Sequence, residues 1–198
     1  MNYEVFETAL GPMGVVVREV EGDRRLRAVR IGHLTLAATE VAILERFPEA
    51  LAAKGLQASK LLIRYAKTGT GDFSSLVLDD DQASSFDRAV RHACRSIPFG
   101  STVTYADLAA LAGAPRRAAR AVGGVMRRNS CPIVVPCHRV TPAGKSWALG
   151  NYSAPQGPAL KRRLLQLEGF RREETPRMAR ARRTSTGRFD VAPRLWDE

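Results

Sequence analysis

The spacing of apolar and polar residues in the first part of the chain predicts short strands joined by helices. Two compact apolar runs, 13–17 and 26–31, flank a turn-like polar segment at 21–23, a pattern that is typical of a β-hairpin. This half carries no cluster of reactive residues, and we expect it to be a scaffold. Its other predicted elements are, in chain order, a helix over 39–46 capped by Thr39, a helix over 57–67 and a strand over 73–78.

A mainly helical pattern begins at residue 85. Apolar residues recur at helical spacing over 86–97, with Ser84 or Ser85 as the cap and Pro98 as the stop. A short helix is expected over 105–112 and a second over 115–128, with a break at Gly113 between them. Two short helices around a glycine-containing turn make a candidate helix-turn-helix.

The charge of the chain is distributed unevenly. Residues 1–84 carry a net charge of −2, residues 85–170 carry +10 and residues 171–198 carry +3, which together give the formal total of +11. A strongly basic second unit favours contact with a polyanion, although a solvated basic face without a partner is the alternative. We therefore predict a scaffold domain over 1–84, a DNA-binding domain over 85–170, and a basic tail over 171–198 that is expected to be disordered or to add a DNA contact.

The cysteine content and the start of the chain indicate a reducing compartment. Cys94, Cys131 and Cys137 are odd in number and form no disulfide framework. The first residues lack the basic and apolar regions of a secretory signal, and no apolar run is long enough to span a membrane. A cytoplasmic location is expected.

The second helix of the candidate helix-turn-helix has an unusual composition. Very small residues let its backbone approach a neighbour closely, and each glycine in a helix costs about 1 kcal/mol relative to alanine. Either close packing against another helix or contact with DNA phosphates explains this composition, and five arginines without an acidic residue favour phosphates. The basic residues are Arg116, Arg117, Arg120, Arg127 and Arg128, and the small ones are Ala118, Ala119, Ala121, Gly123 and Gly124.

The most reactive sequence of the chain follows an apolar run at 133–135, which we expect to be a buried strand that ends near Pro136. A cysteine in an apolar stretch is usually inert core. The adjacent His138 and Arg139 change that expectation, because such neighbours lower a thiol pKa and favour the nucleophilic thiolate of Cys137. Neighbours on a regular strand point to opposite faces, so His138 needs an irregular backbone or a bridging water to act on the sulfur.

The motif Pro136-Cys137-His138-Arg139, within IVVPCHRV, resembles the active-site motif of the O6-alkylguanine-DNA alkyltransferases. The surrounding order agrees, with IPFGSTVTYADLAALAG and RAARAVGGVMRRN before it and GNYS and KRRLLQLEG after it. The resemblance covers about residues 85–170, is weaker over 1–84 and is absent over 171–198. It implies an α/β (α+β) fold, in which a small mixed domain precedes a mainly helical domain with a helix-turn-helix and a short active-site strand.

The resemblance also implies a reaction, in which Cys137 takes the alkyl group from O6 of a flipped guanine and is consumed. His138 would accept the thiol proton through a water, and Glu168 would orient His138. Asn129 would tie the helix-turn-helix to the active-site loop, and Tyr105 would donate to the leaving base. The implied DNA-binding residues are Arg120, Tyr105, Ala118, Ala119, Gly123, Arg127 and Arg128, with Arg120 filling the gap left by the base, and the implied pocket residues are Pro136, Val140, Ser153, Tyr152 and Arg139.

The partner implied by the resemblance is double-stranded DNA that contains O6-alkylguanine or O4-alkylthymine, bound from the minor groove by a monomer. No cofactor is expected. Some members of the family bind zinc in the first domain, but residues 1–84 hold no cysteine and only His33, so no metal is expected. About two additional residues between Ser153 and Lys161, relative to the family pattern, are expected to reshape the pocket rim.

Two other functions compete with alkyl transfer. A non-catalytic lesion-binding protein or helix-turn-helix regulator would use the same basic surface, but it would need no Cys137, His138 and Glu168 together. A cysteine–histidine hydrolase would turn over, and it would need an oxyanion hole that the sequence does not indicate. Taken singly, Glu168, Tyr105 and Arg120 also have structural explanations, and their joint order around the motif favours the alkyl transfer.

Overall fold

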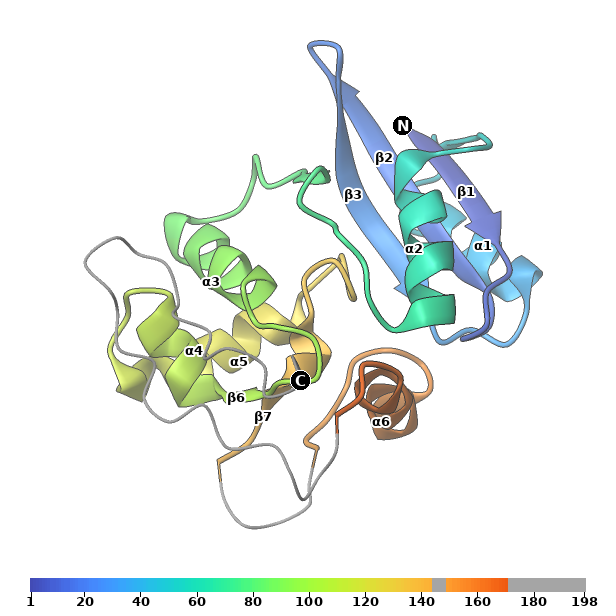
Figure 1. The fold of residues 1–198 in the computed structure, drawn as a ribbon. Helices are drawn as coiled ribbons and strands as arrows, with labels where there is room; N and C mark the ends of the chain where they lie inside the picture. The colour runs from blue at the N-terminus through green and yellow to red at the C-terminus, as the bar shows by residue number, and fades with distance from the viewer. Residues whose placement is uncertain (144–148, 171–198) are drawn as a thin grey trace, which may run out of the picture.

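The computed structural model describes residues 1–143 and 149–170, so the predicted tail lies outside the described residues. The first half forms a five-stranded sheet in the order β4-β1-β2-β3-β5 (Figure 1). The three central strands are antiparallel, and the two short edge strands pair in parallel with β1 and β3. The strands are β1 (Asn2–Phe6), β2 (Met13–Val20), β3 (Asp23–Ile31), β4 (Leu51–Ala52) and β5 (Val77–Leu78).

Alternation along the strands divides the buried side chains between the two faces of the sheet. On one face, Val16 and its neighbours pack against Ile43 of helix α1 (Leu36–Leu44) and against Phe47, which follows that helix. Val15 and Val17 belong to the larger core on the opposite face, where helix α2 (Gln57–Thr68) packs. The first half is therefore a sheet with one helix on each face, and among the described residues the core of the second half continues the face that packs α2.

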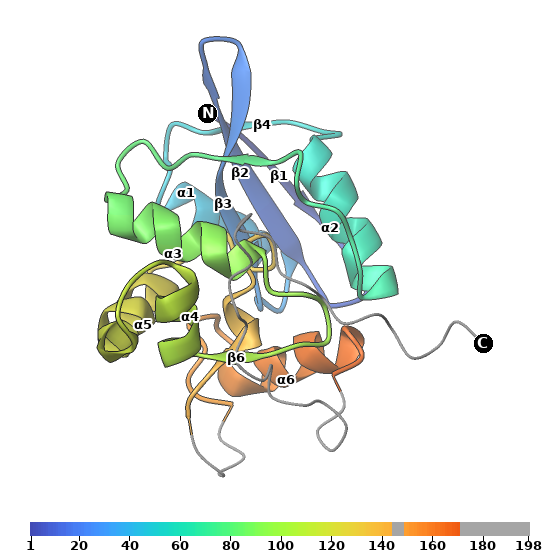
Figure 2. The ribbon, with the colours of Figure 1, turned by 60° about the vertical axis from the view of Figure 1, so that its left-hand side comes forward.

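The second half is mainly helical (Figure 2). Ser84 caps α3 (Ser85–Arg95), and Thr104 and Asp107 form a capping box at the start of α4 (Tyr105–Leu111). The remaining elements are a 3-10 turn (Arg116–Ala118), α5 (Ala119–Arg127), a second 3-10 turn (Cys137–Arg139), α6 (Gly157–Leu167) and the two-stranded parallel sheet of β6 (Val103–Thr104) and β7 (Val140–Thr141).

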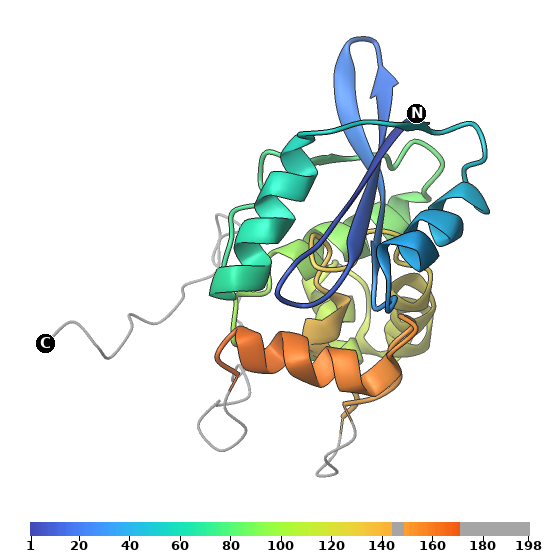
Figure 3. The same ribbon diagram turned by 90° about the vertical axis from the view of Figure 1, so that its right-hand side faces the viewer.

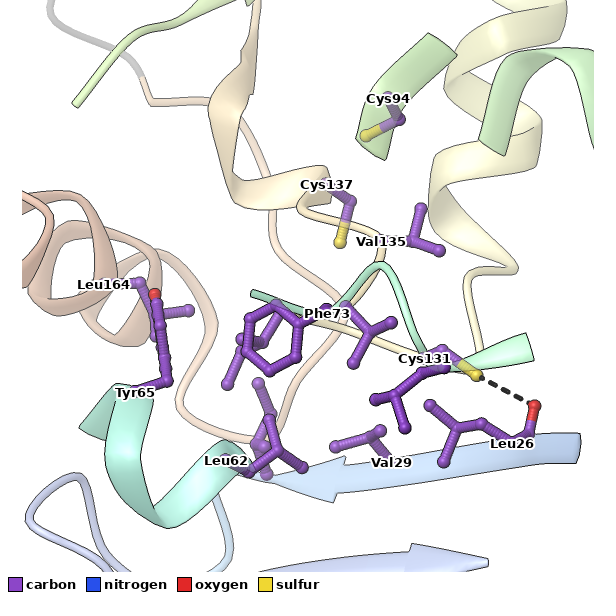
Figure 4. Close-up of a cluster of buried hydrophobic side chains, with 14 of the residues drawn as sticks. Leu26, Val29, Leu62, Tyr65, Phe73, Cys94, Cys131, Val135, Cys137 and Leu164 are labelled. Atoms are coloured by element: carbon purple, nitrogen blue, oxygen red, sulfur yellow. Dashed lines mark hydrogen bonds between the residues drawn. The ribbon is translucent and has the colours of Figure 1, made fainter. Parts of the chain in front are cut away.

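The two halves share one hydrophobic core. Figure 4 shows Val29 of β3, Leu62 of α2 and Phe73 packed toward Val135 and Leu164 of the second half. In Figures 1 and 3 the C-terminal end of α2 lies beside α6. Among the described residues, no helix is long and apolar enough to cross a membrane.

The predicted fold class, with mixed helices and strands, is confirmed, and the hairpin and the helices near 57–67, 86–97 and 105–112 are present. The helix predicted over 115–128 is also present, as a 3-10 turn over 116–118 that continues into α5. Three local predictions are wrong. Thr35 caps α1 in place of Thr39, whose hydroxyl instead donates to the Thr35 carbonyl. The strand predicted at 73–78 is only β5, because Phe73 begins a turn. The segment 133–135 is no strand.

Candidate active site

An irregular turn presents the cysteine of the reactive motif. Ile133 has a φ of 72°, which is unusual for a branched residue and breaks the predicted strand. The chain then enters the 3-10 turn Cys137–Arg139, in which the Arg139 amide donates to the Pro136 carbonyl at 2.9 Å. The irregular backbone that His138 was predicted to need is therefore present.

Asn129 connects the end of α5 to this turn. Its Nδ2 donates both to the Val135 carbonyl at 2.8 Å and to the Cys137 Sγ at 3.1 Å. Its Oδ1 accepts from the Cys131 amide at 3.0 Å. The geometry matches the predicted link between the helix-turn-helix and the active-site loop, and it adds a direct donor to the sulfur.

His138 and Glu168 form a buried hydrogen bond. The His138 Nε2 and the Glu168 Oε1 are 2.7 Å apart, and neither side chain has exposed surface. Arg139 binds the same carboxylate through Nε and Nη2, both at 2.9 Å, and its guanidinium lies 4.1 Å above the ring of Phe99. Glu168 thus holds both residues that follow Cys137.

Charge determines which His138 nitrogen carries the proton. Burial alone would raise the pKa of Glu168, but hydrogen bonds and charges of His138 and Arg139 outweigh burial and lower this pKa to about 2. An ionised carboxylate only accepts, so Nε2 carries the hydrogen and Nδ1 of the neutral ring has a free lone pair. The Nδ1 atom is buried and has no hydrogen-bond partner among the described residues. It is therefore available to accept a proton.

The thiol and the imidazole are both neutral at rest. Burial raises the pKa of Cys137, although the Asn129 donor and the Lys161 charge act in the opposite direction. Burial likewise lowers the pKa of His138 against the effect of Glu168. The lowered thiol pKa predicted from the sequence is wrong, because desolvation outweighs the basic neighbours. The sulfur becomes a nucleophile only when a base removes its proton.

Two buried residues near the site were not predicted from the sequence. The Lys161 Nζ donates to the Val140 carbonyl at 2.6 Å, and burial lowers the Lys161 pKa to about 8. The Tyr65 hydroxyl donates to the Glu168 Oε1 at 2.7 Å. Lys161 could have been noticed in the sequence, because it is a lysine within the apolar face of α6. Tyr65 could not, because it lies 103 positions from Glu168 and nothing in the sequence links the two.

The predicted pocket residues lie in different environments. Pro136 and Val140 are buried beside Cys137, and the hydroxyl of Tyr152 is buried close to the Cys137 thiol. Ser153 is exposed. The three guanidinium nitrogens of Arg139 bind Glu168 and the Ile97 carbonyl, and the residue also lines a pocket together with Pro136 and Phe99.

The surface of α5 carries most of the predicted DNA-binding residues. Arg120 and Arg127 are exposed, as is Arg117 on the preceding turn, and none of these three pairs with an acidic group among the described residues. The prediction of five arginines without counter-charge is wrong for two of them. Arg116 pairs with Asp107, and Arg128 lies 3.4 Å from Asp87; both acidic residues come from neighbouring helices.

The small residues of α5 have space around them. Ala118 and Ala119 are half-buried at its start. A methyl group added at Gly123 would meet the Tyr105 ring at an ordinary 3.9 Å. Among the described residues, one added at Gly124 would meet only the end of a flexible arginine. Packing within this part of the chain therefore does not require glycine at either position. Tyr105 itself lies half-buried over this helix, with a pKa raised first by burial.

Comparison with known proteins identifies relatives of the second half. The family model described as "6-O-methylguanine DNA methyltransferase, DNA binding domain" matches residues 85–170. A human methylated-DNA–protein-cysteine methyltransferase is 50% identical over 91 residues, which are 46% of this chain and 42% of that protein. Its counterpart from Methanothermobacter thermautotrophicus is 44% identical over 100 residues, 50% of this chain and 52% of that protein. The match thus spans only about half the length of these relatives.

A solved structure resembles more of the molecule. The structure of Mycobacterium tuberculosis OGT in complex with DNA superimposes with a TM-score of 0.64 at 27% sequence identity, and the match covers 85% of this chain and 93% of that one. The likeness therefore extends beyond the second half and includes the sheet of the first.

Proposed function

Because residues 85–170 match the family model of the 6-O-methylguanine DNA methyltransferase DNA-binding domain, we propose that this protein repairs DNA by moving an alkyl group from O6 of guanine onto Cys137. The transfer is irreversible, because the thioether that forms has no good leaving group. Each molecule therefore acts once. We assign His138 as the base that takes the Cys137 proton, and Glu168 as the group that orients His138.

The steps balance as a substitution at carbon. The Cys137 thiol passes its proton to the His138 Nδ1, directly or through a water. The sulfur then forms a bond to the alkyl carbon while the bond from that carbon to O6 breaks. The electron pair leaves with guanine, which takes up one proton, and a donor such as Tyr105 placed near the base would stabilise the developing charge.

A single observation carries this assignment: the His138 Nε2 lies 2.7 Å from the Glu168 Oε1, while its buried Nδ1 stays unpaired among the described residues. Asn129 meanwhile donates to the sulfur that must become an anion. A nucleophile, a base and an orienting carboxylate in this order form a general arrangement for activating a thiol. A protein that only binds lesions would not need it.

The α5 surface supports DNA as the partner. Arg117, Arg120 and Arg127 offer unpaired positive charge for phosphates, and the glycines of α5 permit a close approach. A base inside the duplex is out of reach of a buried thiol, so the target must be extruded, and we propose that the exposed Arg120 fills its space. We further propose action as a monomer, in the cytoplasm of a prokaryote or the nucleus of a eukaryote, where the DNA is.

Mass spectrometry after incubation with O6-methylguanine DNA tests the proposal. We expect the intact protein to gain one methyl group on the peptide that contains Cys137, and Cys137→Ser to gain none. Tight binding of the modified DNA without any mass change would instead favour a lesion-binding protein. Repeated turnover by unmodified protein would favour a hydrolase.

A further inference from the structure

Glu168 receives a hydrogen bond from the first half of the chain. Its Oε1 accepts from His138, from Arg139 and from the hydroxyl of Tyr65 on α2, at 2.7, 2.9 and 2.7 Å. The Tyr65 side chain is fully buried, and its ring packs against Phe73 with 5.9 Å between centroids. A buried hydroxyl with one ionised acceptor is a firmly placed donor.

We propose that Tyr65 is a positioning residue for the proton transfer from Cys137: its hydroxyl fixes the Glu168 oxygen that holds His138. This inference rests on the proposed alkyl transfer. It also means that residues 1–84 complete the reaction centre and are more than a scaffold. Tyr65 touches neither the sulfur nor the base, so it acts only through the carboxylate.

Contacts at both ends of α2 fix the position of this helix, and with it the position of Tyr65. At the N-terminal end, the Glu4 carboxylate accepts from the amides of Gly55 and Leu56 at 2.9 and 2.8 Å, so β1 supplies the missing cap. At the C-terminal end, Gly69 has a φ of 72° and lies directly against the Leu167 carbonyl, at only 2.0 Å from where a Cβ would stand. The absence of a side chain lets α2 reach the end of α6, where Glu168 is.

The hydroxyl also affects how readily His138 takes a proton. The partial positive charge of the Tyr65 hydrogen neutralises part of the charge on Oε1, and Oε1 is the atom that would stabilise the imidazolium. Removal of this donor leaves more negative charge facing His138, and its pKa rises. Loss of one neutral donor of this kind should raise the His138 pKa by about half a unit.

Other charged and titratable groups around His138 would remain in place. Lys161 and Glu168 face it from α6 and its end, and Arg139 and Cys137 lie on its own turn. Tyr65 reaches it through Glu168, and the buried Tyr152 lies near Cys137 and Glu168. Burial and the two cations lower the His138 pKa, whereas Glu168 raises it. Since a Tyr65→Phe change alters none of these cations, its effect on His138 has a single expected sign.

The test compares Tyr65→Phe with the wild-type protein in two measurements. The His138 ring is titrated by NMR, which is practical because the chain has only three histidines. The single-turnover rate of transfer from O6-methylguanine DNA is measured from pH 5 to 8. We expect Tyr65→Phe to raise the His138 midpoint by about half a pH unit, with an equal upward shift of the acid limb of the rate.

Phe73→Leu is the matched control, because it loosens the packing around the Tyr65 ring and keeps the hydroxyl. It is expected to lower the melting temperature and to leave the His138 midpoint unchanged. An unchanged midpoint in Tyr65→Phe overturns the proposal, and so does an equal shift in both variants. An upward shift confined to Tyr65→Phe supports the link even if the wild-type protein transfers no alkyl group, in which case the proposed function alone fails.

Discussion

The reaction centre and the α5 surface differ in almost every physical respect. At the centre, His138 and Arg139 are buried and both bind the buried Glu168 carboxylate, which also accepts from Tyr65. On α5, Arg120 and Arg127 extend into solvent without an acidic partner among the described residues. Buried groups can be held accurately enough for proton transfer, whereas exposed cations remain available to a partner.

This difference predicts that chemistry and binding can be changed separately. A variant at the centre should slow the transfer to a bound lesion, and a variant on α5 should weaken the binding while leaving the chemical step intact. Variants of His138 test the chemical side of that separation, and variants of α5 test the binding side.

The largest effect is expected for His138→Gln. Glutamine can still donate to Glu168, but it cannot take the thiol proton, and loss of a general base typically costs about 100-fold to 10,000-fold in rate. Single-turnover mass spectrometry measures the loss, and binding to the same DNA should stay within about twofold. A wild-type rate in this variant would exclude His138 as the base.

The pH dependence of transfer should follow His138. Burial lowers its pKa below 6.5, so the base stays neutral at pH 7 and is lost only as the pH falls through this lowered value. The rate should then drop about tenfold per pH unit on the acid side. The unfolded chain binds the proton more readily, so stability should also decline as the pH falls below about 6.5. If the same fall in transfer rate at low pH persists in His138→Gln, a group other than His138 causes it.

Arg120→Ala is expected to act only on duplex DNA. If Arg120 offsets the cost of base extrusion, which is a few kcal/mol, its loss should slow transfer from duplex DNA by roughly 10-fold to 100-fold. Transfer from the free O6-alkylguanine base should be unchanged. Arg127→Ala is the matched control on the same helix, and it should only weaken binding and lower the salt slope by about one. Equal behaviour of the two variants would remove the special role of Arg120.

The smallest effect is expected for Gly124→Ala. An added methyl group meets only the end of the Arg128 side chain, so the variant should be more stable by about 1 kcal/mol through better helix propensity. If α5 approaches DNA closely, the same methyl group should weaken binding several-fold. Thermal melting and DNA titration measure the two effects, and a gain of stability without any loss of binding would contradict a close approach at this position.

The sequence was informative where the chemistry is local. Cys137, His138 and Arg139 are consecutive, and their adjacency singled out Cys137 as the candidate nucleophile, although burial reverses the pKa shift that it predicted. Periodicity predicted α2, α3 and α4 because each has an apolar face and clear ends. The resemblance to a family added Glu168 and Asn129, and the structure brings both to the predicted turn.

The remaining features depend on tertiary structure. The run 133–135 has the composition of a strand, yet it pairs with no neighbouring strand, and Ile133 turns the chain toward Cys137. Burial of the thiol, which reverses the expected direction of its pKa, is a property of the whole core. In the sequence, Tyr65 looks like an ordinary core residue of α2. Its hydrogen bond to Glu168, which is far away along the chain, is what distinguishes it.

The hydrophobic core described above runs without a break from Leu26 and Leu62 into Val135 and Leu164 (Figure 4). A boundary that is visible in charge and composition near residue 84 therefore has no counterpart in the interior. The two parts should melt cooperatively, as one endotherm in calorimetry, and neither should keep its native structure when expressed by itself.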